Sequence, residues 1–281
     1  MHKSLLAISS ILLLGASSYA VRAADLFPQG EHTNFDTYVL ALSWQPGFCQ
    51  SKGYSPAECP NLRNGEGELD ALTIHGLWPS LPESLNISVG NWHKKGCNAV
   101  YNPQTERNYP SATKPWCNSK PVDMSPAFHQ GLVKYMPGIK EPTCLHQYEY
   151  AKHGVCFGFK PEDYFGAMIS LNRDLRNSPV GKFMKDNYGE EVNTADFKQV
   201  IVDTYGEDVS RNAVQLICTP TKKGLALTEI RLALRASEIN TTLAYTSFNT
   251  DQSEVSGGSS NCGKSFTLIK YREDNKSQRV D

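Results

Sequence analysis

Hydrophobic and polar residues alternate in two short stretches in the first third of the chain. Residues Tyr38–Trp44 are rich in strand formers and predict a central β-strand. Residues Leu72–His75 alternate apolar with polar side chains and predict a second strand with one buried face. A glycine and a proline interrupt the pattern directly afterwards, so we expect His75 at the end of this strand and Trp78 on a turn.

Apolar residues in the middle of the chain recur at helical spacing, and the pattern returns to strands near the C-terminus. The predicted helices are Ser125–Tyr135, 144–153, Pro161–Asn177, Val180–Tyr188 and Thr194–Tyr205. The predicted strands are Ala213–Cys218, Leu225–Arg235 and Ser265–Tyr271. Two stretches lack periodicity and predict long irregular connections, Cys49–Leu69 and Pro82–Cys117. Helices and strands in separate blocks predict an α+β fold: a single domain with a central, mainly antiparallel sheet flanked by several helices.

The helix predicted at 144–153 carries an unusual mixture of side chains on one face. At 100° per residue, six residues share an arc: Leu145, Tyr148, Glu149, Lys152, His153 and Cys156. A carboxylate, an ammonium group and an imidazole on one arc suit proton transfer beside an anion, and Lys152 offers a charge for a phosphate. We expect Glu149 and the C-terminal helix dipole to raise the pKa of His153. The alternative interpretation is a solvated surface cluster of these charges, which has little energetic effect.

His75 and Trp78 each allow a structural interpretation beside the functional one. His75 is fixed by a strand yet close to solvent, which suits a site, but it equally fits a half-buried histidine of the core. Trp78 can present an indole face for stacking, but a lone tryptophan is more often a core anchor. The residues of this stretch alone leave both interpretations open.

The first 23 residues have the layout of a secretory signal peptide. A short basic start, an apolar run too brief to span a bilayer and a small-residue end predict cleavage after Ala23, with Ala20 as the alternative. No later stretch is long and apolar enough to cross a membrane, so we expect no membrane association. The 8 cysteines of an exported chain predict disulfides, whereas zinc binding is disfavoured because no Cys-x-x-Cys pair occurs.

Removal of the signal peptide changes the charge only slightly. It takes Lys3 and Arg22 from the 28 basic residues and none of the 29 acidic residues, which leaves 26 basic side chains and a net charge of −3. Proteins that hold nucleic acid across a broad face are usually basic. If this chain acts on a nucleic acid, we therefore expect local, weak binding and turnover, which suits an enzyme better than a stable binding module.

Two short motifs stand out in the sequence. The first is His-Gly-Leu-Trp-Pro after a hydrophobic residue, at 74–79, and the second is Glu-aromatic-x-Lys-His-Gly-x-Cys, at 149–156. Together they resemble the secreted ribonuclease T2 family, and within it the bacterial periplasmic type. Both occur in the family's order at a domain-sized separation, and the resemblance extends upstream to 42–49. It implies a ribonuclease domain of α+β fold over residues 24–281, which cleaves single-stranded RNA in the periplasm or outside the cell.

The resemblance implies a role for each polar residue of the two motifs. His153 would accept a proton from the 2′-hydroxyl and His75 would donate one to the departing 5′-oxygen, while Glu149 and Lys152 steady the phosphoryl oxygens. The product would be a 2′,3′-cyclic phosphate, with no metal and no cofactor required. DNA would not be cleaved, because it lacks the hydroxyl. Tyr148 stands where many relatives have a third, phosphate-binding histidine, and its hydroxyl is expected to substitute.

Recognition of the base is expected to be weak. Trp78 is expected to stack on a base, and stacking tolerates any base. Ser80 stands where several relatives have an aspartate that reads the base. Gln45 is expected to touch a base edge. The expected partner is therefore single-stranded RNA of any sequence, bound by a monomer.

The family pattern also suggests a disulfide arrangement. It pairs Cys49 with Cys59, Cys97 with Cys156 and Cys218 with Cys262, and leaves Cys117 for Cys144. Eight cysteines on their own allow many pairings, so this one follows from the resemblance.

Two alternative functions compete with this interpretation. A zinc hydrolase could use His75, Glu149 and His153 as ligands, although no His-Glu-x-x-His motif is present. A catalytically silent RNA-binding or immunity-type protein could keep the same fold, although the intact site residues argue against it. Digestion of RNA with and without a chelator distinguishes the three.

Overall fold

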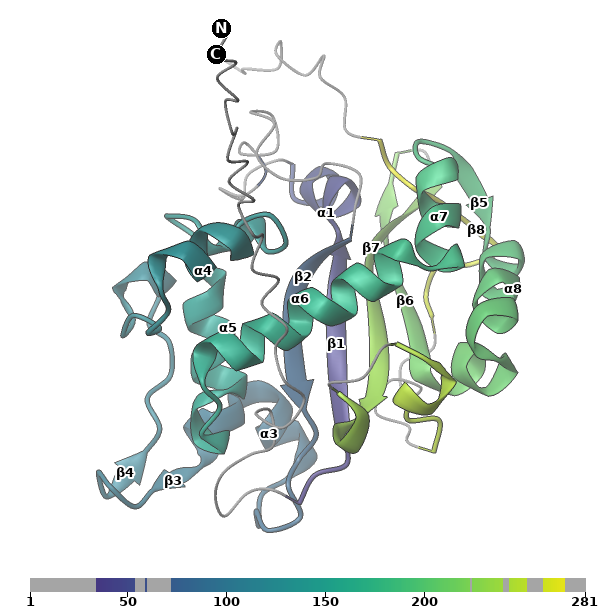
Figure 1. The fold of residues 1–281 in the computed structure, drawn as a ribbon. Coiled ribbons are helices and arrows are strands. Elements are labelled where there is room, and N and C mark those ends of the chain that lie inside the picture. The colour runs from purple at the N-terminus through teal and green to yellow at the C-terminus, as the bar shows by residue number, and fades with distance from the viewer. Residues whose placement is uncertain are drawn as a thin grey trace, which may run out of the picture.

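The structure is a computed structural model that describes residues 34–53, 59, 72–222, 224–239, 243–251 and 260–270. The predicted signal peptide at 1–23 and most of the predicted connection at 49–69 lie outside these residues. The described chain forms a central sheet with helices packed around it (Figure 1).

The central sheet has six strands in the order β2–β1–β7–β8–β5, with β6 paired to β7 as well. The strands are β1 (Thr37–Trp44), β2 (Leu72–Pro79), β5 (Glu191–Asn193), β6 (Val214–Thr221), β7 (Gly224–Arg235) and β8 (Ser265–Thr267). Among the described strands of this sheet, all pairs are antiparallel except β7 with β8. The predicted α+β fold with a mainly antiparallel sheet is confirmed.

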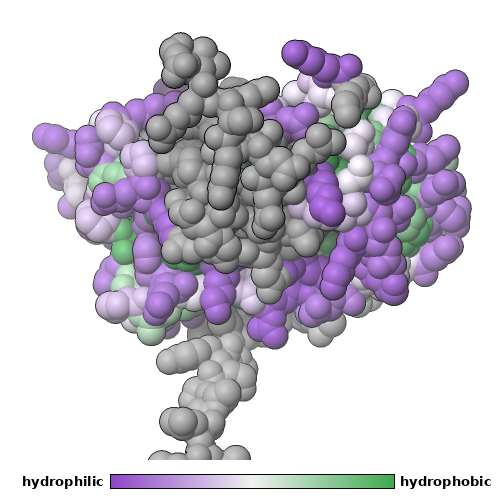
Figure 2. All heavy atoms as spheres, turned by 90° about the horizontal axis from the view of Figure 1, so that it is seen from above, coloured by the Kyte–Doolittle hydropathy of each residue, from purple (hydrophilic) through white to green (hydrophobic). Residues whose placement is uncertain are grey.

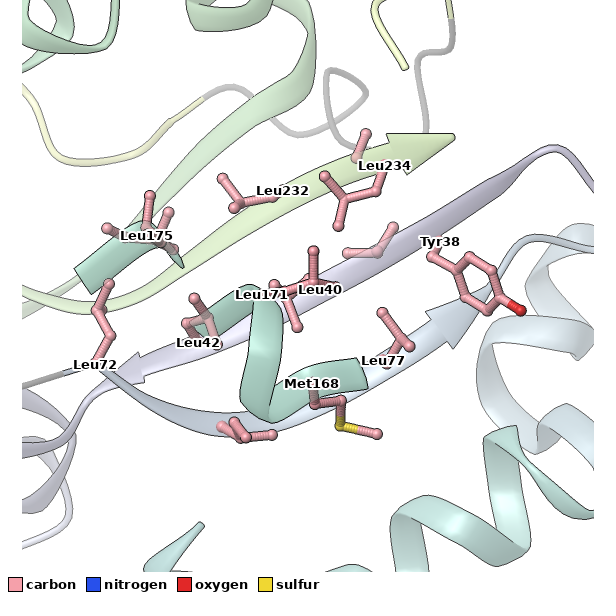
Figure 3. Packing of buried hydrophobic residues seen from close by; sticks show 14 of the residues in the cluster. Tyr38, Leu40, Leu42, Leu72, Leu77, Met168, Leu171, Leu175, Leu232 and Leu234 are labelled. Atoms are coloured by element: carbon pink, nitrogen blue, oxygen red, sulfur yellow. The ribbon is translucent and has the colours of Figure 1, made fainter. Parts of the chain in front are cut away.

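Helix α6 (Pro161–Asn177) lies across one face of the sheet and closes the core. A proline at its first position and two acidic residues in its first turn favour its N-terminus. Leucines of β1, β2 and β7 pack beneath Met168, Leu171 and Leu175 of the helix (Figure 3). Side chains alternate along a strand, so residues 39 and 41 of β1 and 229 and 231 of β7 point to the opposite face. That face carries the candidate site.

The other helices surround the sheet and match most of the predicted ones. They are α1 (Gln45–Ser51), α3 (Val89–Lys95), α4 (Pro126–Leu132), α5 (Leu145–His153), α7 (Pro179–Asp186) and α8 (Thr194–Tyr205). Short 3-10 or π turns are Gly96–Ala99, Trp116–Asn118, Pro137–Ile139, Val155–Phe157, Val209–Ala213, Ala236–Glu238 and Tyr245–Ser247. The five predicted helices are confirmed, with ends that differ by a few residues.

Two predictions for the N-terminal half were wrong. The stretch 82–117 is not irregular throughout, because it contains α3 and a small hairpin of β3 (Tyr101–Asn102) and β4 (Arg107–Asn108). The strand that begins at Leu72 does not end at His75, because β2 continues to Pro79 and pairs with β1 along its length. Tertiary pairing therefore outweighs the local effect of the glycine and the proline, which an edge strand tolerates.

All four disulfides join the cysteines that the resemblance suggested: Cys49–Cys59, Cys97–Cys156, Cys117–Cys144 and Cys218–Cys262. Two of them hold the ends of α5. Cys144 directly precedes the helix and is bonded to Cys117, while Cys156 follows it and is bonded to Cys97. The helix with the mixed charges is thus covalently attached to the body at both ends.

The described residues on the face seen in Figure 2 are predominantly hydrophilic. In Figure 2, hydrophobic residues form small scattered patches between polar ones around the grey atoms. Among the described residues, the large hydrophobic side chains that are exposed are Val89, Tyr101 and Tyr245. None of the described helices combines the length and the apolar character that a membrane crossing needs.

Candidate active site

A β-bulge in β2 determines where His75 points. Gly76 pairs with Ala41 of β1 and Ile74 pairs with the next residue, Leu42, so His75 is the extra residue without a partner. A bulge of this kind re-aims a side chain. In a regular strand, His75 and Trp78 would lie on opposite faces, because they are three residues apart. With the bulge, both line the same cavity.

His75 is held by two carboxylates. Its Nδ1 lies 2.7 Å from Oε2 of Glu229 on β7, and its Nε2 lies 3.7 Å from Oε1 of Glu149 on α5. An ionised carboxylate only accepts, so Nδ1–H donates to Glu229 and Nε2 is left facing the cavity. Burial lowers the pKa of His75, but the hydrogen bond with Glu229 and the charge of Glu149 outweigh burial and raise the pKa above its ordinary value of 6.5.

Glu149 is buried between the other site residues. Its side chain is 1% exposed, and its Oε2 accepts a hydrogen bond of 2.8 Å from Nε1 of Trp78. Burial raises the pKa of this carboxyl group, against the opposing effects of His75, Trp78 and Lys152. Gly76 leaves the necessary room, because a Cβ there would lie 2.2 Å from Oε2 of Glu149 and 2.4 Å from Nε1 of Trp78. The motif glycine is therefore required by close approach to this pair.

His153 lies in the last turn of α5 and is almost fully buried. Its side chain is 9% exposed, and its Nε2 lies 4.0 Å from Oε2 of Glu149, beyond hydrogen-bonding distance. Burial lowers the pKa of His153 well below 6.5, and the positive charges of Lys152, His75 and His93 lower it further. The expectation that the pKa of His153 is raised was wrong, because desolvation outweighs the nearby carboxylate and the helix dipole. The lowered pKa favours the neutral form of His153 near neutral pH.

Lys152 and Tyr148 form a second polar group at the edge of the cavity. Nζ of Lys152 donates a hydrogen bond of 3.1 Å to the hydroxyl of Tyr148. The ring of Tyr148 also stacks on Trp116, with centroids 4.5 Å apart. The lysine and the tyrosine hydroxyl, which is still free to donate its own proton, are both placed to bind an anion.

One cavity of about 360 Å³ brings the predicted residues together. Its lining includes His75, Trp78, Tyr148, Glu149, Lys152 and His153, together with Val39, Pro79, Trp92, His93 and Arg231. Gln45 is not part of this lining. It is 4% exposed, and its amide oxygen accepts a hydrogen bond of 2.6 Å from Thr73 instead. The structure thus gives no support to a contact between Gln45 and a base.

Trp78 lies within strand β2 and lines the cavity. Its indole N–H is used by Glu149, and Arg231 lies over its ring at 5.2 Å. The rings of His75 and His153 lie 5.3 and 5.7 Å from it. Trp78 therefore packs among the polar side chains of the site and orients Glu149, rather than standing on a turn as predicted.

Among the residues missed from the sequence are two charged residues of β7 at the site, Glu229 and Arg231. They lie two apart on β7, so both point to the face that carries His75. The available signal was the period-two spacing of these two charged residues inside the largely apolar predicted strand Leu225–Arg235. Among the described residues, no group of three or more His, Cys, Asp or Glu side chains is arranged to hold a metal ion.

The chain is similar to several known proteins. The model of the Ribonuclease T2 family matches residues 35–262. Ribonuclease I of Escherichia coli (strain K12) is 37% identical over 277 residues, which cover 96% of this chain and 97% of that protein. A ribonuclease of Aeromonas hydrophila is 28% identical over 63% of this chain and 60% of its own length. Ribonuclease MC1 from bitter gourd seeds superposes with a TM-score of 0.49 at 18% identity, over 83% of this chain and all of that one (100%).

Proposed function

The chain belongs to the ribonuclease T2 family of RNA-cleaving enzymes, and from this we propose that it cleaves single-stranded RNA by acid–base catalysis with two histidines. One observation carries the proposed mechanism. His75 and His153 come from a strand and a helix far apart in the sequence, yet each has its Nε2 within 4.0 Å of the Glu149 carboxylate. The two imidazoles thus share one cavity with a lysine at its edge.

The directions of the two pKa shifts support separate roles for the two histidines. A general base must be neutral and a general acid must be protonated when the substrate binds. The pKa of His153 is lowered and the pKa of His75 is raised. Near neutral pH, this order favours the productive combination of neutral His153 with protonated His75. If the pKa of His153 were the higher of the two, the combination of neutral His153 with protonated His75 would be rare.

In the proposed reaction, His153 takes the proton of the 2′-hydroxyl as the 2′-oxygen attacks phosphorus. His75 gives its proton to the 5′-oxygen as the bond between phosphorus and that oxygen breaks, which leaves a 2′,3′-cyclic phosphate. Lys152 and the hydroxyl of Tyr148 stabilise the charge on the phosphoryl oxygens. Glu149 lies beside both imidazoles. Its carboxyl group therefore faces the positive charge on His75 before the reaction and the positive charge on His153 after it.

The proposed substrate is single-stranded RNA with little preference for the base. Ser80, which stands where several relatives have a base-reading aspartate, is 6% exposed and hydrogen-bonds Asp36. No carboxylate is therefore presented to a base from this position. DNA lacks the 2′-hydroxyl nucleophile and is not a substrate, and the mechanism requires no metal and no cofactor. We propose that the chain acts as a monomer.

The proposed location is the periplasm or the outside of the cell. The signal-peptide pattern at 1–23 supports export, with a mature chain of residues 24–281. The four disulfides support an oxidising compartment, because such bonds persist there and are rare in the cytosol.

End-group analysis tests the proposed function. Mature protein incubated with mixed-sequence RNA and excess chelator is expected to release fragments that end in 2′,3′-cyclic phosphates, detected by mass spectrometry. RNA of the same mixed sequence with 2′-O-methyl groups is the matched control, because it lacks the nucleophile. Absence of cyclic ends would favour a silent binding protein. Loss of cleavage with chelator, restored by zinc, would favour the zinc hydrolase.

A plot of kcat/KM against pH is expected to be bell-shaped, with a broad plateau around pH 6.5. On the acidic side, the rate falls as His153 becomes protonated, at a pH below 6.5 because its pKa is lowered. On the basic side, the rate falls as His75 loses its proton, at a pH above 6.5 because its pKa is raised. Cleavage of a short RNA over a series of buffers measures both limbs. A narrow optimum with both limbs on the same side of 6.5 would contradict the assignment.

A further inference from the structure

Glu229 and Arg231 reach the site across an intervening strand. Both belong to β7, while His75 belongs to β2, and β1 lies between these strands. Glu229 pairs with Ser43 of β1, and Arg231 pairs with Ala41. These two β1 residues have small side chains on the face of the cavity. Their small size lets side chains of β2 and β7 meet above β1, which larger residues would prevent.

The contacts form a closed circuit around His75. Nδ1 of His75 lies 2.7 Å from Oε2 of Glu229, and the other carboxylate oxygen lies 2.5 Å from Nε of Arg231. The Arg231 guanidinium lies over the ring of Trp78, whose N–H donates to Glu149. Glu149 in turn faces Nε2 of His75 at 3.7 Å. Each polar group that fixes His75 is thus itself held by another member of the circuit.

We propose that Glu229, held by Arg231, is the positioning residue for His75: it fixes the ring so that Nε2 presents the catalytic proton to the departing 5′-oxygen. This inference rests on the proposed function and extends it by a pair of residues outside both motifs. A carboxylate on one nitrogen of an imidazole fixes its tautomer and orientation and stabilises its cation. Glu229 therefore acts through His75 and need not contact RNA.

The electrostatics agree with this role. Burial raises the pKa of Glu229, but the hydrogen bond and charge of His75 and the charge of Arg231 outweigh burial and lower the pKa below its ordinary value. The lowered pKa favours the ionised form of Glu229 near neutral pH, where His75 has to be protonated. The charged groups that act on His75 are Glu229 and Arg231 from β7 and Glu149 from α5. The only one of these to hydrogen-bond His75 in the described structure is Glu229.

The test compares Glu229→Gln with wild type by two independent measurements. NMR titration of histidine-labelled protein, with the His75 signal assigned from His75→Ala, is expected to show a lower His75 pKa in Glu229→Gln. The basic limb of the rate profile is expected to move to lower pH with it. RNA cleavage is expected to fall by roughly 10- to 100-fold, by analogy with the loss seen when the hydrogen-bond partner of a metal-binding histidine is removed. Cleavage of uridine 3′-(4-nitrophenyl phosphate) should change little, because its leaving group departs without a proton.

Glu207→Gln is the matched control, because it removes one exposed carboxylate that pairs with Arg211 away from the cavity. It should leave both the His75 pKa and the rates unchanged. An unchanged His75 pKa in Glu229→Gln, or equal losses of rate on both substrates, would overturn the inference. The proposed function would still stand in that case, provided that the wild-type protein cleaves RNA. If wild type does not cleave RNA, the proposed function fails first, and the inference falls with it. The NMR shift would then report only a structural ion pair.

Discussion

Replacing His153 by alanine is expected to lower the rate of RNA cleavage by about 10²–10⁴-fold, the contribution of a general base. Burial and the nearby positive charges keep this imidazole neutral, so it can accept the proton of the 2′-hydroxyl. The variant has no other neutral imidazole beside Glu149, since the second histidine there is the protonated His75. The loss should therefore occur with RNA and equally with an activated substrate, because both need the same nucleophile. Single-turnover cleavage of a short RNA and of the nitrophenyl ester measures it.

His146→Ala is the matched control for this loss. His146 is also buried on α5, two turns before His153, and burial with the charge of His129 lowers its pKa to about 4. It does not belong to the lining of the cavity. Circular dichroism and the melting temperature should report any damage to the helix in both variants. If His146→Ala were as inactive as His153→Ala, the loss would reflect disturbed packing of α5 and the base assignment would fail.

The elements that the sequence predicted well are those with strong local signals. The helices at Pro161–Asn177 and Thr194–Tyr205 have the predicted ends, because a proline or an asparagine cap starts them and their apolar stripes face the core. Helix α1 was missed because its seven residues include a proline and a glycine and show no apolar stripe. The backbone of Gly47 lies so close to β7 that an added Cβ would be 2.0 Å from the carbonyl oxygen of Leu227, a contact that spacing along the chain does not reveal.

The candidate site was predictable only where its residues lie in one motif or the other. The motifs contain both histidines, Glu149 and Lys152, and the structure brings them into one cavity. Glu229 and Arg231 could not be paired with His75 from the sequence, because the partnership depends on the strand order and on the bulge in β2. The direction of the pKa shift of His153 was missed for a related reason. A helical projection gives the neighbours of a side chain but not its burial, and burial is the larger effect here.

Replacing His75 by alanine is expected to lower RNA cleavage by about 10²–10⁴-fold as well, but through the leaving group. His75 supplies the proton to the 5′-oxygen, and an alkoxide leaves slowly without one. A nitrophenolate leaves readily unprotonated, so His75→Ala should lose far less with the nitrophenyl ester than with RNA. His153→Ala should lose activity with both substrates, and this contrast separates the proton donor from the acceptor. Equal losses in His75→Ala on the two substrates, with an unchanged melting temperature, would show that His75 is not the donor.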